Sequence, residues 1–192
     1  MLLYKGAGPG THWSIHDPAK AGGFPTARGV ANLHSLVRHI VNYSWPSQHT
    51  SFSASYAVAC DYALLGLSGR ATKAAPGVVY EIDTTLAPGL VLVDPAREIL
   101  KGNPKLPRYQ QTHHDGGQNL IIGIAGGLPA VLAATPRRPT PPSVPAGPGS
   151  GTGGPPVVNL ALRALVFAIR DAEVLARRRV PRTCIVNRYL VY

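Results

Sequence analysis

The chain has 192 residues, 45% of them hydrophobic, so it is long enough for one domain that buries roughly 70% of its unfolded surface. Its two cysteines exclude a disulfide-rich scaffold and a zinc site built from four cysteines, and its formal net charge is +10. No uninterrupted apolar run reaches the roughly 18–20 residues of a membrane span, and no basic region followed by a long apolar core indicates a signal peptide.

The first part of the chain is predicted to alternate strands and helices. Residues 2–5 favour a short strand that leads into a glycine-rich loop. Residues 30–43 favour a helix with His34 and His39 on its solvated face. The apolar face of that helix repeats at i, i+3, i+4, i+7 and i+8 and consists of Leu33, Leu36, Val37, Ile40 and Val41. A short strand is expected at residues 50–53.

The middle of the chain is dominated by predicted strands. Ser55 can cap a helix over residues 56–65. Residues 77–83 and 90–94 favour strands separated by a Pro-Gly turn, and residues 118–125 favour another buried strand. Helices early in the chain and strands later, with no internal repeat, favour an α+β fold over a regular βαβ alternation.

The last part begins with a change in composition. Thirteen of the 21 residues from 136 to 156 are proline or glycine, which is typical of a loop or linker. Asn159 can then cap a helix that runs into the basic residues 176–179, and residues 184–192 favour a closing strand. We therefore expect a core over residues 1–135, a linker over 136–156, and a C-terminal basic helix and strand over 157–192 packed on the core.

The positive charge is concentrated near the C-terminus. Residues 128–192 hold nine arginines and only two acids. Such an excess attracts polyanions, which include nucleic acid, an acidic membrane surface and an acidic protein. The charge alone does not choose among these partners.

Two common ligand motifs are absent, and a metal site is not expected. The glycines at residues 6–10 do not have the spacing of a dinucleotide-binding loop, and the later glycine-rich segment lacks the Gly-Lys-Ser/Thr of a nucleoside-triphosphate loop. His12 and His16 are four residues apart, and His113 and His114 are adjacent. Adjacent histidines usually diverge, whereas metal ligands must converge.

Several weak motifs occur in an order that is more specific than any one of them. The first strand ends in Tyr4-Lys5, and Gly22-Gly23-Phe24 follows. The strand with Ser51-Phe52-Ser53 precedes a helix that carries spaced alanines, and the strand VVYEID comes next. The segment His113–Gln118 (HHDGGQ) precedes a last strand and a Gly-Gly-Leu-Pro sequence.

Over residues 2–130 this order resembles bacterial ADP-ribosyltransferase toxins of the cholera-toxin-like and pierisin-like kind, including effector domains at the C-termini of polymorphic toxins. The resemblance implies a split α+β core of two facing sheets with an NAD cleft between them. It also implies that NAD is a substrate and that no metal is needed.

The resemblance assigns a role to individual residues. The residues it places in catalysis are Gln118, Ser51 and Asp115. Those it places around NAD are Lys5, Tyr4, Ser51, Ser53 and Phe24. Those expected to recognise the acceptor, partly because of their charge, are His114, Gly116, Arg177, Arg178 and Arg179.

Two positions depart from the family pattern. Lys5 stands where the family has arginine, and Gln118 stands where it has the catalytic glutamate. Because glutamine carries no negative charge, either Asp115 is the acid or this copy is weak or inactive. Gly116 stands where members that modify arginine have glutamate, so arginine is the less favoured acceptor.

The function predicted from the resemblance is transfer of ADP-ribose from NAD to RNA, DNA or protein. The domain would act as a secreted or injected effector in the cytoplasm of a target cell and would have a cognate immunity protein. Two alternatives stay open. One is a basic nucleic-acid-binding module, or a toxin remnant bound to an immunity protein, without catalysis. The other is a ribonuclease toxin that uses His49, His113 or His114 as general acid and base without NAD.

Overall fold

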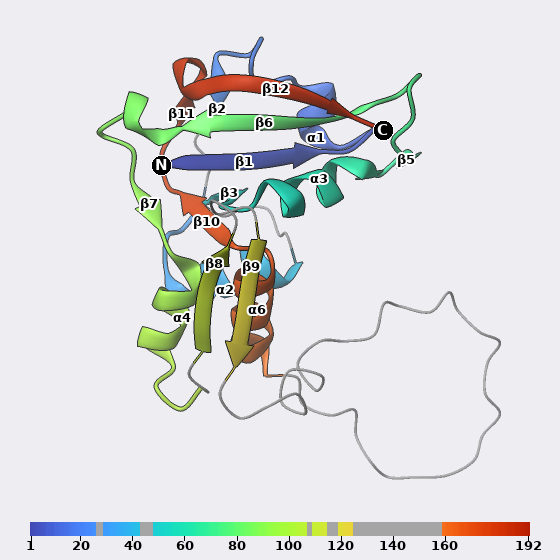
Figure 1. Cartoon of the computed structure of the whole chain (residues 1–192). Coiled ribbons are helices and arrows are strands. Elements are labelled where there is room, and N and C mark those ends of the chain that lie inside the picture. The colour runs from blue at the N-terminus through green and yellow to red at the C-terminus, as the bar shows by residue number, and fades with distance from the viewer. Residues whose placement is uncertain (26–28, 43–47, 107–108, 115–118, 125–158) are drawn as a thin grey trace, which may run out of the picture.

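A computed structural model describes the chain except for residues 26–28, 43–47, 107–108, 115–118 and 125–158. The described residues form an α+β fold, as predicted, around an antiparallel sheet of six strands (Figure 1). In spatial order these strands are β12 (Ile185–Val191), β6 (Gly77–Asp83), β1 (Leu2–Ala7), β3 (Thr50–Ser53), β10 (Glu173–Ala176) and β7 (Leu92–Val93). The N-terminal strand β1 therefore lies inside the sheet, and the C-terminal strand β12 forms one edge, separated from β1 by β6.

The six strands form two halves that meet at β1 and β3. Strands β1 and β6 pair over six residues, whereas β1 and β3 share only the pair Tyr4 and Ser53. In Figure 1, β7 and β10 turn away from the direction shared by β12, β6 and β1. The sheet thus bends at the β1–β3 junction.

Each half of the sheet has its own buried core. Around β7 and β10 the core is formed with three helices, α2 (Leu33–Asn42), α4 (Pro95–Gly102) and α6 (Leu160–Arg170). Around β1, β3 and β6 it contains the rings of Phe24, Phe52 and Tyr80, which meet edge to face. Helix α3 (Tyr56–Leu64) packs against β1 and β6.

The smaller elements complete the described chain. They are α1 (His12–Ile15), the pair β2 (Gly23–Phe24) and β11 (Val180–Pro181), the pair β4 (Leu65–Gly66) and β5 (Gly69–Arg70), the pair β8 (Tyr109–His114) and β9 (Asn119–Ile124), and the 3-10 turns η1 (Thr84–Leu86) and η3 (Arg182–Cys184). None of the described helices is long and apolar enough to cross a membrane.

Local sequence signals place several elements as predicted. Ser55 caps α3 by accepting a hydrogen bond from the backbone N–H of Val58. Asn159 caps α6 by accepting one from the N–H of Leu162, at 3.1 Å. Such caps satisfy backbone donors that have no partner inside the helix. The strand predicted at 77–83 is observed with those bounds, and the one predicted at 90–94 is shorter.

The prediction that the C-terminal helix runs into residues 176–179 is wrong. Helix α6 ends at Arg170, and Ala172 adopts a left-handed backbone conformation with φ of 47°. An L-residue in this conformation cannot continue a helix, so the chain turns and enters β10. Strand β10 lies between β3 and β7, so the C-terminal part supplies an interior strand. The expected linker at 136–156 lies outside the described residues.

Close packing of α3 on the sheet depends on glycine at two positions. A Cβ atom added to Gly6 of β1 would collide with the backbone carbonyl of Ala59, and one added to Gly77 of β6 would collide with that of Ala63. Because the obstacle is helix backbone, neither site can yield by rotating a side chain. The two glycines therefore set how closely α3 lies to the sheet.

We predict that Gly77→Ala lowers the free energy of unfolding by about 1–3 kcal/mol, the usual cost of overpacking. The matched control is Gly89→Ala, because a Cβ at Gly89 meets nothing within 4 Å. Urea denaturation of both variants measures the difference. Equal midpoints would show that α3 does not pack against β6 in this way.

Candidate functional site

The candidate site is centred on a serine and a glutamate from neighbouring strands. The hydroxyl of Ser51 in β3 donates a hydrogen bond of 2.6 Å to Oε1 of Glu173, the first residue of β10. The two strands are antiparallel, with Glu173 opposite Ser53 and Leu175 opposite Ser51. Both partners are half-buried, so the bond is partly shielded from water.

Lys5 contributes the opposite charge from β1. Burial lowers the pKa of Lys5 to about 8, and the negative charge of Glu173 partly opposes this shift. Burial raises the pKa of Glu173 to about 7. This pKa of about 7 already includes the lowering by the Ser51 hydrogen bond, the raising by Asp171 and the lowering by Lys5 and Arg170. At neutral pH the carboxyl group therefore exists in both protonation states, and Lys5 remains mostly protonated.

His39 joins the same group from helix α2. Its Nε2 atom lies 2.7 Å from Oγ of Ser51, so the serine connects the histidine to Glu173. Burial, His49 and Lys5 lower the pKa of His39 to about 4, which leaves its ring neutral at neutral pH. The prediction that His39 lies on a solvated face is wrong, whereas His34 is exposed as expected.

His49, the residue that precedes β3, lies close to His39. Its side chain is buried, and its ring centroid is 6.0 Å from that of His39. Burial and the neighbouring charge of Arg177 lower its pKa to about 4. A buried, neutral histidine is poorly placed to exchange protons with RNA, as the ribonuclease alternative requires. The side chains of His113 and His114 lie outside the described part of the chain.

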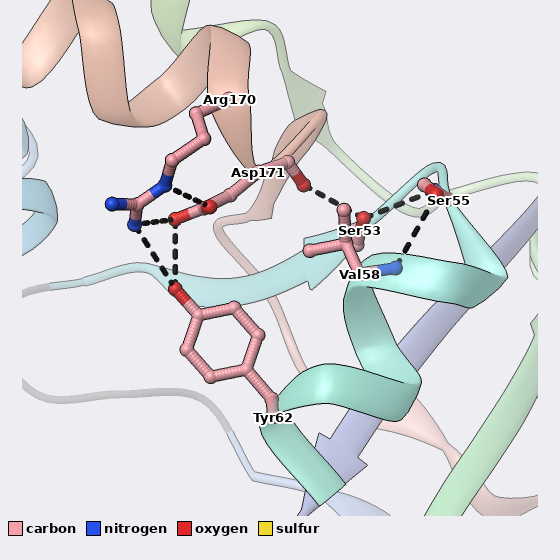
Figure 2. A network of polar contacts seen from close by, with 6 residues as sticks. All are labelled: Ser53, Ser55, Val58, Tyr62, Arg170 and Asp171. Atoms are coloured by element: carbon pink, nitrogen blue, oxygen red, sulfur yellow. Dashed lines mark hydrogen bonds and ion pairs between the residues drawn. The ribbon is translucent and has the colours of Figure 1, made fainter. Parts of the chain in front are cut away.

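A second set of hydrogen bonds fixes the turn that leads into β10 (Figure 2). The hydroxyl of Ser53 donates to the carbonyl oxygen of Asp171, at 2.7 Å, and accepts from the N–H of Ser55, at 3.0 Å. The carboxylate of Asp171 accepts from Nε of Arg170, at 2.6 Å, and from the hydroxyl of Tyr62, at 2.7 Å. These bonds tie the end of α6 to both β3 and α3 immediately before the glutamate.

Three residues expected around NAD have other surroundings. Phe24 is fully buried among Trp13, Phe52 and Tyr80, so the prediction that it contacts NAD is wrong. Ser53 is buried, and its hydroxyl is engaged in fixing the turn before β10. Tyr4 is half-buried, and its ring packs edge to face on that of Tyr56.

The three arginines expected to recognise an acceptor have different surroundings. They follow β10 instead of ending a helix. Arg177 is half-buried beside His49, Arg178 is exposed, and Arg179 donates from Nη2 to the carbonyl of Gly22, at 2.8 Å. The prediction that these arginines lie at the end of a helix is therefore wrong, although Arg178 and Arg179 are exposed as expected.

The remaining predicted residues cannot be placed next to this group. Asp115, Gly116 and Gln118 lie outside the described residues, and His114 is described only as the last residue of strand β8. Their proposed roles stay predictions.

Glu173 and His39 were missed by the sequence reasoning. A signal for Glu173 was present, because Asp171 and Glu173 are the only acids among residues 128–192. Because the helix was predicted to continue through both acids, Glu173 was not expected on a strand. His39 had no comparable signal, since only the tertiary fold brings α2 against β3.

Other polar features of the described chain lie apart from this site. An open depression is lined by Ser14, His16, Asp17, Lys20 and Arg188, among other residues, and includes neither Ser51 nor Glu173. Within the described ranges, no group of three or more histidine, cysteine or acidic side chains could hold a metal ion.

Comparison with known proteins adds no assignment. No protein-family model matches the chain, and no similar curated protein or solved structure was found. The function of the site therefore has to be argued from its geometry and chemistry.

We predict that the unaltered protein loses stability relative to Glu173→Gln as pH rises from 4.5 towards 7. The folded pKa of Glu173 is about 7, above its ordinary value of 4.5, so the folded state binds more protons in this window. Deprotonation at higher pH therefore favours unfolding. Urea midpoints across this window measure the effect.

The matched control for that measurement is Asp61→Asn, which changes an exposed carboxylate on α3. Its stability difference from the unaltered protein should stay constant with pH. A constant difference for Glu173→Gln as well would show that this carboxyl group has no raised pKa.

Proposed function

We propose that the chain is an NAD-dependent mono-ADP-ribosyltransferase in which Glu173 is the catalytic acid residue. The supporting observation is the 2.6 Å hydrogen bond from Ser51 to Glu173 on adjacent strands. Lys5, on the strand beyond β3, supplies the third group that the resemblance to ADP-ribosyltransferase toxins requires. The proposal keeps the roles predicted for Ser51 and Lys5. It assigns the catalytic carboxylate to Glu173 instead of position 115 or 118.

Glu173 would act on the charge that develops during the reaction. As the bond between nicotinamide and ribose breaks, nicotinamide leaves with the bonding electrons and the ribose becomes positive. An ionised carboxylate facing the ribose stabilises this transition state more than the ground state. A nucleophile of the acceptor then bonds to the same ribose carbon and loses its proton to water.

Ser51 and Lys5 would hold the reacting groups in place. The hydrogen bond from Ser51 orients one carboxylate oxygen and favours the ionised form of Glu173. The ammonium group of Lys5 offers a point charge for the pyrophosphate of NAD, without the two-pronged geometry of arginine. With a pKa of about 8, it carries that charge at neutral pH.

This proposal changes the meaning of Gln118. If Glu173 supplies the negative charge, the neutral amide at position 118 is no sign of an inactive copy. Neither Asp115 nor Gln118 is then needed as the catalytic acid. The remaining proposals from the resemblance stand beside this one: an effector toxin, a cognate immunity protein, and an RNA, DNA or protein acceptor.

We predict that Glu173→Gln lowers NAD turnover by about 10²–10³-fold, the usual loss when one preorganised charge is removed from a transition state. Gln118→Glu should change turnover little, and Asp61→Asn should leave it unchanged. Release of nicotinamide, measured by chromatography, reports turnover. Millimolar NAD should also raise the melting temperature of the unaltered protein, because it binds only the folded state.

The opposite results would be equally informative. A large gain from Gln118→Glu, with no loss from Glu173→Gln, would move the acid to position 118. If folded protein neither binds nor turns over NAD, the transferase proposal fails. RNA cleavage without NAD would then favour the ribonuclease alternative.

We expect labelled NAD to transfer its label to a macromolecule in a cell lysate. Digesting the product separately with nuclease and protease distinguishes a nucleic-acid acceptor from a protein acceptor. The net charge of +10 is compatible with a nucleic-acid acceptor, because basic surfaces are attracted to phosphate, and with an acidic protein acceptor. Release of nicotinamide without a labelled product would show NAD hydrolysis instead of transfer.

A further inference from the structure

His39, Ser51 and Glu173 form a continuous chain of hydrogen bonds that the proposed reaction does not by itself require. Nε2 of His39 is 2.7 Å from Oγ of Ser51, which is 2.6 Å from Oε1 of Glu173. The three residues come from α2, β3 and β10, so the chain crosses from a helix to two strands. It exists only when these elements pack together.

The chemistry of the three groups allows only one direction for these bonds while Glu173 is ionised. A carboxylate can only accept, and a serine hydroxyl has a single proton to donate. Ser51 uses that proton in its hydrogen bond to Glu173, so the Ser51 oxygen must accept a hydrogen bond from His39. Nε2 of His39 therefore carries a hydrogen, and a neutral ring then has none on Nδ1.

We propose that His39 is a positioning residue whose Nε2–H directs the Ser51 hydroxyl onto Glu173 and favours the ionised carboxylate. This inference rests on the proposed function, because it concerns the same serine and glutamate. His39 touches neither NAD nor the acceptor in this scheme. It acts by fixing where the hydroxyl proton points.

If the proton enters on Oε1, protonation of Glu173 reverses every bond in the chain. The carboxylic acid then donates to Ser51, and Ser51 donates to Nε2 of His39. The ring must change to the tautomer with its hydrogen on Nδ1. One proton is gained at Glu173, and the ring stays neutral throughout, so His39 reports the state of the acid without titrating itself.

The charged groups around the chain agree with this arrangement. Facing His39 are His49 from the start of β3 and Lys5 from β1, and both disfavour a positive ring. Facing Glu173 are Lys5 and Arg170, which favour its ionised form, and Asp171, which opposes it. Burial and the charge of Arg177 lower the pKa of His49, so that ring is neutral as well.

The first test measures the tautomer of His39 directly. Protein with ¹⁵N-labelled histidine is examined by NMR at about pH 9 and about pH 5, on either side of the Glu173 titration. We expect a hydrogen on Nε2 at the higher pH and on Nδ1 at the lower. A hydrogen on Nδ1 at the higher pH would overturn the proposal, whereas a hydrogen on Nε2 at both pH values would support it and place the proton of Glu173 on Oε2.

The second test compares His39→Leu, which removes the donor, with His39→Gln, which keeps an N–H of similar reach. The titration of Glu173 is followed by ¹³C NMR of its carboxyl group and assigned with Glu173→Gln. We expect His39→Leu to raise the midpoint by about one pKa unit, since it weakens the support of the charged form, and His39→Gln to restore it. His34→Leu, on the exposed face of α2, is the matched control.

Neither readout depends on NAD, so failure of this inference and failure of the proposed function are distinguishable. Equal midpoints for His39→Leu and the unaltered protein would overturn the positioning role, whatever the activity. If His39→Leu does not fold, the tautomer in the unaltered protein decides alone. In an active protein, the acidic limb of the rate profile should shift with the midpoint.

Discussion

Insertion of β10 between β3 and β7 is the constraint on which the candidate site depends. It places Glu173 across from Ser53 and within hydrogen-bond reach of Ser51, although 122 residues separate that serine from the glutamate. The insertion requires the chain to leave α6 abruptly, and the left-handed backbone of Ala172 makes that possible. A longer helix would remove both the strand and the acid from the sheet.

Several hydrogen bonds hold the turn between α6 and β10 in place. Ser53 binds the backbone carbonyl of Asp171, and Tyr62 binds its carboxylate from α3 (Figure 2). The position of the glutamate is thus linked to the packing of α3, which in turn depends on Gly6 and Gly77 in the sheet. The acid is held by the scaffold and not by a loop, as precise placement of a reacting group requires.

Partial burial gives the site its chemical character. Removal from water raises the pKa of Glu173 and lowers those of Lys5 and His39. Each of these pKa shifts disfavours the charged form of its group. The opposite charges of Lys5 and Glu173 partly offset the shifts, because each charge favours the ionised form of the other group. The hydrogen bond from Ser51 adds to this support for the carboxylate. The site can therefore hold an acid near its midpoint at neutral pH beside a neutral histidine.

The local elements of this protein can be predicted from its sequence. Helical spacing in α2, the caps Ser55 and Asn159, and the apolar run of β6 each depend on neighbouring residues, so their patterns could be read directly. Order along the chain also identified Lys5 and Ser51 as candidates. The contacts of Glu173 and His39 with Ser51, and the burial of Phe24 in the core, are visible only in the folded protein. Those relations depend on which strands pair and on how α2 packs, and such contacts between distant segments leave no periodic signal in a single sequence.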